Sequence, residues 1–272
     1  MKPFSGTPRE MLASLWRNRA LLSNLVRREI LSRYRGSVLG LFWSFVQPVL
    51  MLAIYTFVFS VVFKARWSVG SDSKTEFALV LFAGLITFNL FSECVARSPT
   101  LIIGHANYVK KVVFPLEILP WVSLGAALFQ MLMSLSVWLL FYGLFLGMPP
   151  LTLLCLPMIL LPIVLITMGL SWILASLGVY VRDVGQMIGI MLTVLMFLSP
   201  IFYPISALPA NYQQLLLLNP LTPVIEGMRD ILYWGHLPHL ASYGVYFLFS
   251  ILFACLGFAW FQKTRRGFAD VL

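Results

Sequence analysis

Residue types that could carry acid–base or metal chemistry are few in this chain, and only two groups of them stand close together. Glu93 and Arg97 are four positions apart near the end of an apolar run, so they share one face of a helix. We expect them to form a structural ion pair, with a role in a gate as the alternative. The second group, the acidic residues and histidines of 226–239, has no recognisable catalytic motif. No Gly-Lys dipeptide occurs, so the chain lacks a Walker A phosphate loop, and we expect no catalytic, metal or cofactor site in it.

The composition is too apolar for a water-soluble protein. Hydrophobic residues make up 60% of the 272 positions and charged residues only 11%, and the mean hydropathy is +0.90. Soluble domains carry about 25% charged residues, which they need to cover their surface. The three cysteines lie inside apolar runs without C-x-x-C spacing, so neither a disulfide framework nor a zinc site is indicated. A soluble enzyme and a disordered chain are therefore excluded, and an all-α integral membrane protein remains.

Apolar runs long enough to cross a bilayer as helices set the domain organisation. A crossing needs about 20 apolar residues, and the Gly147-Met148-Pro149-Pro150 turn divides the longest run because paired prolines end a helix. We expect a single transmembrane domain over residues 1–272. Its six predicted spans are residues 38–63, 77–96, 118–146, 151–181, 184–203 and 243–261.

The remaining apolar segment, residues 204–238, contains five prolines. It therefore predicts short helices that lie at, or dip into, the outer face of the membrane, with a seventh span as the alternative. Within it, Glu226, Arg229 and Asp230 have helical spacing, which favours an amphipathic helix with a solvated face or an outer gate.

The basic residues predict the orientation. With both termini in the cytoplasm, fifteen of the 19 Lys and Arg residues fall on the inner side and four on the outer side, as the positive-inside rule requires. The first apolar run begins at Val38, too late for a signal peptide, so we expect the first span to act as its own insertion signal.

Residues 10–35 predict a basic helix before the first span. Apolar residues from Met11 to Val26 form one stripe, and arginines lie on the opposite face. Such a helix suits a place among lipid headgroups, docking of a cytoplasmic partner, or both. At its end two arginines and a tyrosine meet the membrane and two glycines permit a bend. The expected cytoplasmic gate or hinge consists of Arg33, Tyr34, Arg35, Gly40 and Trp43.

These residues and four further segments resemble the membrane subunits of bacterial ATP-binding-cassette exporters of polysaccharides, which include O-antigen, capsule and teichoic-acid exporters. The further segments are LFAGL at 81–85, KKVVFPLEILP at 110–120, SPIFYP at 199–204 and NPLTP at 219–223. The resemblance implies a homodimer of six-span subunits in the bacterial plasma membrane, with two separate ATPase subunits that bind ATP and Mg²⁺. It also implies export of a lipid-linked glycan.

Residues 99–115 then become a candidate ATPase-coupling segment on the cytoplasmic side. Aromatic and basic side chains at its tip would suit a groove on an ATPase, although Lys110 and Lys111 alone are equally typical of an ordinary positive-inside loop. The residues expected to couple are His105, Tyr108, Lys110 and Lys111.

Aromatic residues are the expected lining of the substrate path, because sugars stack their C–H faces on rings. Tyr55, Phe59 and Phe63 recur at every fourth position of the first span, and Phe197 and Tyr203 belong to the fifth. Packing against lipid or neighbouring helices is the alternative for each of them. The polar residues Gln47, Asn89 and Gln130 should face other helices or the conduit.

Two other classes of function compete with a transport subunit. An ion-coupled carrier needs no ATPase but predicts acids along its pathway, and Glu93 is the only acid well inside an expected span. An integral-membrane enzyme that modifies glycans or lipids predicts clustered His, Asp or Glu, for which residues 226–239 are the only candidate region.

Overall fold

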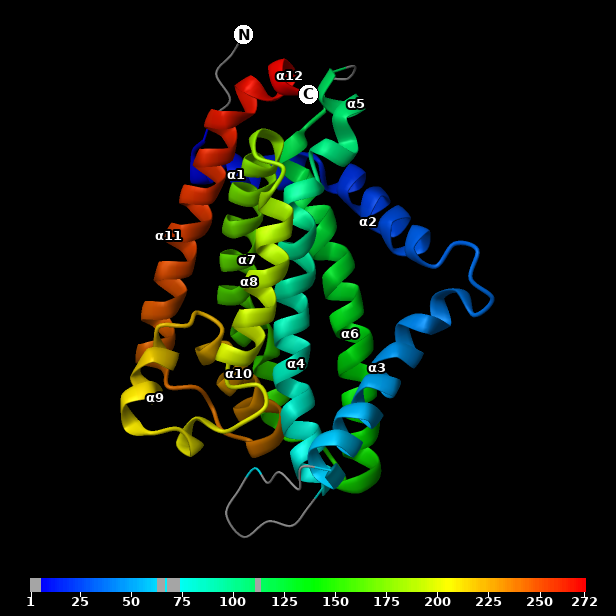
Figure 1. The fold of residues 1–272 in the computed structure, drawn as a ribbon, viewed down its shortest axis with the longest axis vertical. Coiled ribbons are helices and arrows are strands. Elements are labelled where there is room, and N and C mark those ends of the chain that lie inside the picture. Colours follow the sequence, from blue (N-terminus) through cyan, green and yellow to red (C-terminus); the bar gives the residue numbers. More distant parts are fainter. Residues whose placement is uncertain (1–5, 63–66, 68–73, 111–113) are drawn as a thin grey trace.

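The computed structural model describes residues 6–62, 67, 74–110 and 114–272, and every regular element in these ranges is a helix (Figure 1). The helices are α1 (Pro8–Arg17), α2 (Arg19–Arg33), α3 (Trp43–Tyr55), α4 (Lys74–Arg97), α5 (Ala106–Lys110), α6 (Leu119–Phe145), α7 (Leu156–Tyr180), α8 (Val184–Leu198), α9 (Ala210–Leu217), α10 (Thr222–Arg229), α11 (Leu240–Thr264) and α12 (Phe268–Val271).

Five of the expected membrane spans are present as long apolar helical segments. They are Gly40–Phe59, Thr75–Thr100, Leu116–Phe145, Leu151–Tyr180 and Leu240–Val271. The turn after α6 lies where the paired prolines predicted it, and Gly147 has a φ of 92° there, a value that suits glycine. The limits of the long spans thus depend on apolar composition and on proline, which are properties of the local sequence.

The expected span at 184–203 is represented by the shorter helix α8. Its 15 residues span about 22 Å at 1.5 Å per residue, less than the roughly 30 Å of a bilayer core. The helix ends at Leu198 because Ser199 precedes Pro200 and takes an extended conformation, with φ −93° and ψ 148°. Figure 1 shows α8 beside α7, where it carries the chain back toward α9 and α10. A sixth membrane crossing therefore stays a prediction.

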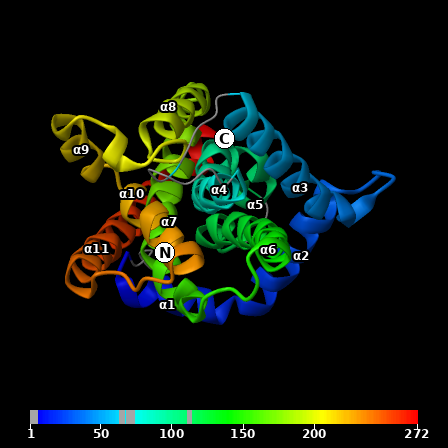
Figure 2. The same cartoon turned by 90° about the horizontal axis from the view of Figure 1, so that it is seen from below.

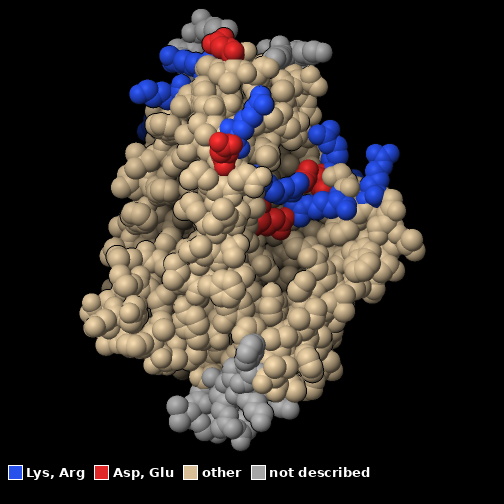
Figure 3. All heavy atoms as spheres, in the orientation of Figure 1, with Lys and Arg blue, Asp and Glu red and all other residues tan. Residues whose placement is uncertain are grey.

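The ends of the bundle differ in which elements they hold. In Figure 1, α1, α5 and α12 lie at one end and α9 and α10 near the other. Figure 3 shows that the Lys, Arg, Asp and Glu side chains visible on this face gather toward the α12 end, while the described surface below them is uncharged. The orientation of the two termini across the membrane stays a prediction from the basic residues.

Helix α4 is the centre of the bundle (Figure 2). In its most apolar stretch 83% of the residues are buried, compared with 17% in the first span, which contains α3. Helices α7 and α11 pack especially closely, because a Cβ atom added to Gly257 would lie 2.3 Å from the carbonyl oxygen of Gly169. Small residues allow this approach between membrane helices. The chain thus has a tightly packed side, α4–α7–α11, and a loosely attached helix, α3.

The prediction of a single helix over residues 10–35 is wrong, because the segment forms two helices. The chain breaks at Asn18, whose side-chain amide donates to the carbonyl oxygen of Ser14 at 2.8 Å and competes with the helical backbone. After α2, Gly36 and Gly40 have φ values of 84° and 51°. These glycines make the bend that leads into the first span, as their positions in the sequence predict.

Candidate functional site

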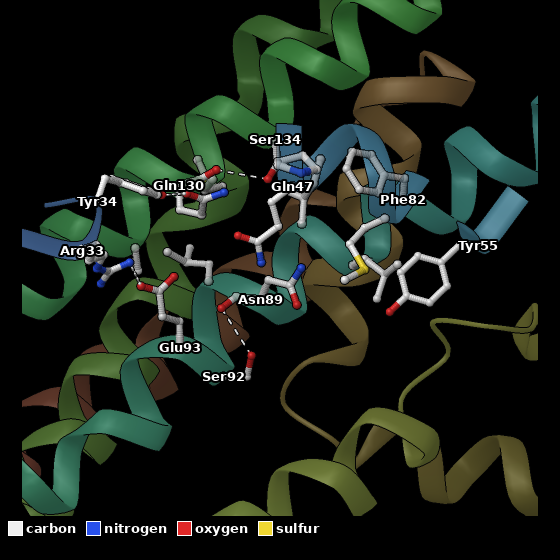
Figure 4. A pocket seen from close by; sticks show the side chains of 17 residues that line it. Arg33, Tyr34, Gln47, Tyr55, Phe82, Asn89, Ser92, Glu93, Gln130 and Ser134 are labelled. Atoms are coloured by element: carbon white, nitrogen blue, oxygen red, sulfur yellow. Dashed lines mark hydrogen bonds and ion pairs between the residues drawn. The ribbon is translucent and has the colours of Figure 1, made fainter. Parts of the chain in front are cut away.

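A partly open cavity of about 510 Å³ lies between α3, α4 and α6 (Figure 4). The polar residues Gln47, Asn89 and Gln130, one from each of these helices, all line it. In Figure 4 the amide groups of Gln47 and Asn89 point into the same space. The structure therefore brings together the three amides that were expected to face either other helices or a conduit.

Hydrogen bonds connect the start of α3 with α6 across one wall of this cavity. The Tyr34 hydroxyl donates to Oε1 of Gln130 at 3.1 Å, and Nε2 of Gln130 donates to the carbonyl oxygen of Ser44 at 3.2 Å. Burial raises the pKa of the Tyr34 phenol, so its hydroxyl remains a neutral donor at physiological pH. Gln130 of α6 thus holds both the end of α2, through the predicted hinge residue Tyr34, and the start of α3, through Ser44.

Charged residues of α2 and α4 lie at the end of the cavity nearest the bend. Arg33 forms an ion pair with Glu93, Arg97 forms one with Glu29, and Arg33 also lies 3.8 Å from Glu29. We refer to these four residues as the α2–α4 charge cluster. The prediction that Glu93 pairs with Arg97 is wrong, because each of them pairs instead with a residue of opposite charge on α2. Only Arg33 and Glu93 of this cluster line the cavity.

Aromatic rings from the first span, from the end of α8 and from the segment after α8 meet beside the other end of the cavity. Phe202 stacks on Phe59 with ring centres 5.1 Å apart, and it also contacts Tyr55 at 6.3 Å and Phe197 at 5.7 Å. Tyr55 belongs to both features, since it also lines the cavity. Three of the five aromatic residues expected along a substrate path are thus in one cluster.

Of the other two expected aromatic residues, the structure describes only Tyr203, whose ring is not part of this cluster. Tyr203 turns its hydroxyl back to donate to the carbonyl oxygen of Phe197 at 3.0 Å. Phe63 lies outside the described residues. Of the remaining hinge residues, Arg35 and Trp43 are exposed, and neither lines the cavity.

Arg229 is buried, contrary to the solvated face expected for its cluster. Its side chain is 1% exposed and donates to Glu226 at 2.6 Å, to the carbonyl oxygen of Val80 at 3.1 Å and to that of Ile201 at 2.9 Å. The guanidinium also lies 4.2 Å from the ring centre of Trp67. Arg229 therefore fastens α10 to α4 and to the segment that carries the aromatic cluster. Lipid offers no partner for such a charge, which explains why it is enclosed.

The candidate coupling segment lies at the α12 end of the bundle (Figure 1). The Tyr108 ring stacks on Phe114 at 4.4 Å and on His105 at 5.4 Å, and its hydroxyl accepts a hydrogen bond from Arg28 of α2 at 3.3 Å. The side chain of Lys110 and the whole of Lys111 lie outside the described residues. The two described coupling candidates thus contact each other, and Tyr108 also contacts α2.

Glu117 was not singled out in the sequence, although it connects several elements. It is 6% exposed and accepts hydrogen bonds from Ser14 of α1 at 2.8 Å and from Arg265 at 2.5 Å. Arg265 also donates to the carbonyl oxygen of Phe114, and Trp172 of α7 donates to the backbone oxygen of Glu117. A lone acid at the start of a long apolar run was the available signal, because such a charge needs a partner. The sequence does not say that the partner follows 148 positions later.

Comparison with known proteins places these features in a family. Residues 20–233 match the family model described as ABC-2 type transporter. The chain is 26% identical over 253 residues to the O-antigen export system permease protein RfbA of Klebsiella pneumoniae, and the match covers 93% of this chain and 95% of that protein. It is 32% identical over 129 residues to the protein of the same name from Myxococcus xanthus, covering 47% of each chain. Five apolar helices, four of them inside the matched residues, together with a family match of this extent show that the chain is a multi-pass membrane protein that belongs to the ABC-2 type transporter membrane family.

Proposed function

We propose that this chain is the transmembrane subunit of an ATP-driven exporter that moves a lipid-linked polysaccharide across the bacterial plasma membrane. The observation that carries the proposal is the match, over 93% of the chain, to a permease named for O-antigen export. ATP hydrolysis is assigned to separate ATPase subunits, because residues 1–272 contain no Walker A loop.

The cavity supplies a chemical basis for a glycan path. Its amides can exchange hydrogen bonds with successive hydroxyl groups, and the adjoining rings of Tyr55, Phe59 and Phe202 offer faces for sugar C–H groups. Neither kind of contact requires a fixed register, which suits a polymer that slides. One subunit has only a half-open cavity, so we propose a two-fold homodimer of six-span subunits, the commonest symmetry for oligomers.

Coupling is proposed to run from the ATPase through residues 99–115 to α2 and then to the cavity. The contact of Tyr108 with Arg28 and the pairing of α2 with α4 provide the physical connection on the permease side. His105, Lys110 and Lys111 are proposed to complete the contact with the ATPase, and Arg35, Gly40 and Trp43 to belong to the hinge.

The test is transport by the purified complex of this chain with its ATPase in proteoliposomes, using a labelled lipid-linked oligosaccharide. Export should require ATP, and the chain alone should hydrolyse none. Tyr55→Ala should slow export about three- to tenfold, the loss expected when a ring contact is removed, with basal ATP hydrolysis unchanged. Phe57→Ala is the matched control, because Phe57 lies on the same segment, is 60% exposed and lines a different, apolar groove. Export without ATP by the chain alone would assign it to ion-coupled carriers instead.

A further inference from the structure

A second hollow lies under α2, away from the cavity between α3, α4 and α6. Its volume is about 540 Å³, and its walls are formed by one face of α2 together with Leu41 and Phe129. The cavity proposed for the glycan shares none of these residues. The hollow therefore needs its own explanation, which does not depend on the cargo.

The face of α2 that forms this hollow carries two parallel rows of side chains. Leu22, Val26 and Ile30 recur at every fourth position and make an apolar row. Arg19, Ser23 and Arg27 recur with the same spacing and make a polar, basic row beside it. Residues four apart stack along one side of a helix, so the two rows run along the hollow together. The hollow thus has a basic edge and an apolar floor.

Packing between α2 and α6 determines the depth of the hollow. A Cβ atom on Gly125 would lie 2.6 Å from a methyl carbon of Val26, so only glycine lets the helices approach this closely. Leu25 of α2 packs against Ile118 and Val122 near the start of α6. These contacts fix α2 across the ends of the spans and leave the groove open beside them.

The position of the groove relative to the membrane matches an amphiphile. Leu41 and Phe129 belong to the apolar spans Gly40–Phe59 and Leu116–Phe145, whereas Arg19 and Arg27 lie on the exposed helix before them. Trp16, which is 73% exposed, stacks under the Arg19 guanidinium at 4.6 Å, and tryptophan is typical of the membrane–water interface. A basic row on the helix before the spans suits a lipid headgroup, and a floor that includes span residues suits an acyl chain.

We infer that this groove binds one anionic phospholipid of the cytoplasmic leaflet, with its phosphate against Arg19, Ser23 and Arg27 and one acyl chain along Leu22, Val26, Ile30 and Phe129. Charge complementarity selects the anionic headgroup, because each basic residue near such a surface adds to the attraction. The apolar floor is filled only by a ligand with an acyl chain. Inorganic phosphate and soluble phosphate esters lack that chain, so they should bind weakly. The bound lipid fills the space between α2 and the first span.

Native mass spectrometry of the purified full-length chain in detergent tests the inference. The protein is titrated with phosphatidylglycerol or phosphatidylcholine carrying the same acyl chains, and the fraction of chains with one bound lipid is measured. The wild type should bind one phosphatidylglycerol more tightly than phosphatidylcholine. Arg19→Gln with Arg27→Gln should weaken the first phosphatidylglycerol about thirtyfold, as expected for two basic residues, and weaken phosphatidylcholine much less, because its choline already neutralises the phosphate.

Arg9→Gln with Arg266→Gln is the matched control, because it removes the same charge from exposed residues at the same end of the molecule. This variant should keep the preference for phosphatidylglycerol. Glycerol 3-phosphate in excess should not displace the lipid. The inference is overturned if the Arg19/Arg27 variant binds phosphatidylglycerol as the wild type does, if the control loses the preference equally, or if the soluble phosphate displaces the lipid.

Discussion

Reversing the charges of the α2–α4 charge cluster should show whether its ion pairs hold α2 to α4. Arg33→Glu would place a carboxylate against Glu93 and Glu29, so two attractive contacts become repulsive. Two charges 4 Å apart near a protein surface interact by about 4 kcal/mol at most. The side chains of Arg33 and Glu93 are about one-quarter exposed, 23% and 24%, which reduces the net loss to about 1–2 kcal/mol for the single change.

The Arg33→Glu, Glu93→Arg double variant should recover only part of this loss. It restores a pair between positions 33 and 93, but the carboxylate introduced on α2 then faces Glu29, and the guanidinium introduced on α4 lies one helical turn from Arg97. Reversing Glu29 and Arg97 as well should remove both repulsions. The order of stability should therefore be wild type, quadruple variant, double variant, single variant.

Thermal unfolding of the purified chain in detergent measures this order, and the double-mutant cycle gives the coupling energy directly. The control is Glu10→Arg with Arg17→Glu, which reverses an exposed pair within α1 and should change stability by less than about 0.5 kcal/mol. A double variant no more stable than the sum of its two single changes would refute the reasoning. The pairs would then be incidental, and α2 would be held by its apolar contacts alone.

Three other changes test separate parts of the structure. Gly84→Val should destabilise the protein by about 1–3 kcal/mol, because a Cβ atom there would already lie 3.0 Å from the Arg229 guanidinium. Thermal unfolding measures the loss, and Gly189→Val is the control, because a Cβ atom at Gly189 would have no atom within 4 Å. Glu117→Gln should cost about 1–3 kcal/mol by removing the carboxylate that faces Arg265, whereas Asp270→Asn at an exposed site should have little effect; equal unfolding temperatures would mean that the pair contributes nothing. Lys110→Glu with Lys111→Glu should weaken ATPase retention in a pull-down while membrane insertion is unchanged, and full retention would remove these residues from the proposed interface.

The long helices could be predicted from the sequence because their limits depend on local properties. Apolar length decides whether a segment can cross a bilayer, and prolines and glycines decide where it turns. Pro200 ended α8 five residues before the expected limit at 203, and this too follows from a local steric rule. The break at Asn18 was missed because a polar side chain within a basic helix has two outcomes of similar energy, and tertiary packing selects between them.

The pairing of the charged residues could not be predicted in the same way. Glu93 and Arg97 have the spacing of an ion pair on one helix, yet each pairs with α2. Arg229 has the spacing of a solvated helix face, yet it is enclosed by groups from α4 and the segment after α8. In each case the partner depends on which helices are neighbours, and a periodic pattern along the chain carries no information about that.

The cavity has one wall that differs from the others in how firmly it is held. Helices α4 and α6 belong to the packed bundle, whereas the first span, with α3, is only 17% buried and follows a bend made by Gly36 and Gly40. Segments with few buried apolar contacts open at the lowest free-energy cost. Widening the cavity therefore costs least when α3 moves, and the hydrogen bond that holds the beginning of α3 to α6 is the one from Gln130 to the carbonyl oxygen of Ser44. Gln130 also accepts from Tyr34, which directly follows Arg33, so a displacement of α2 would act on the Arg33–Glu93 ion pair and on the Tyr34–Gln130 hydrogen bond together.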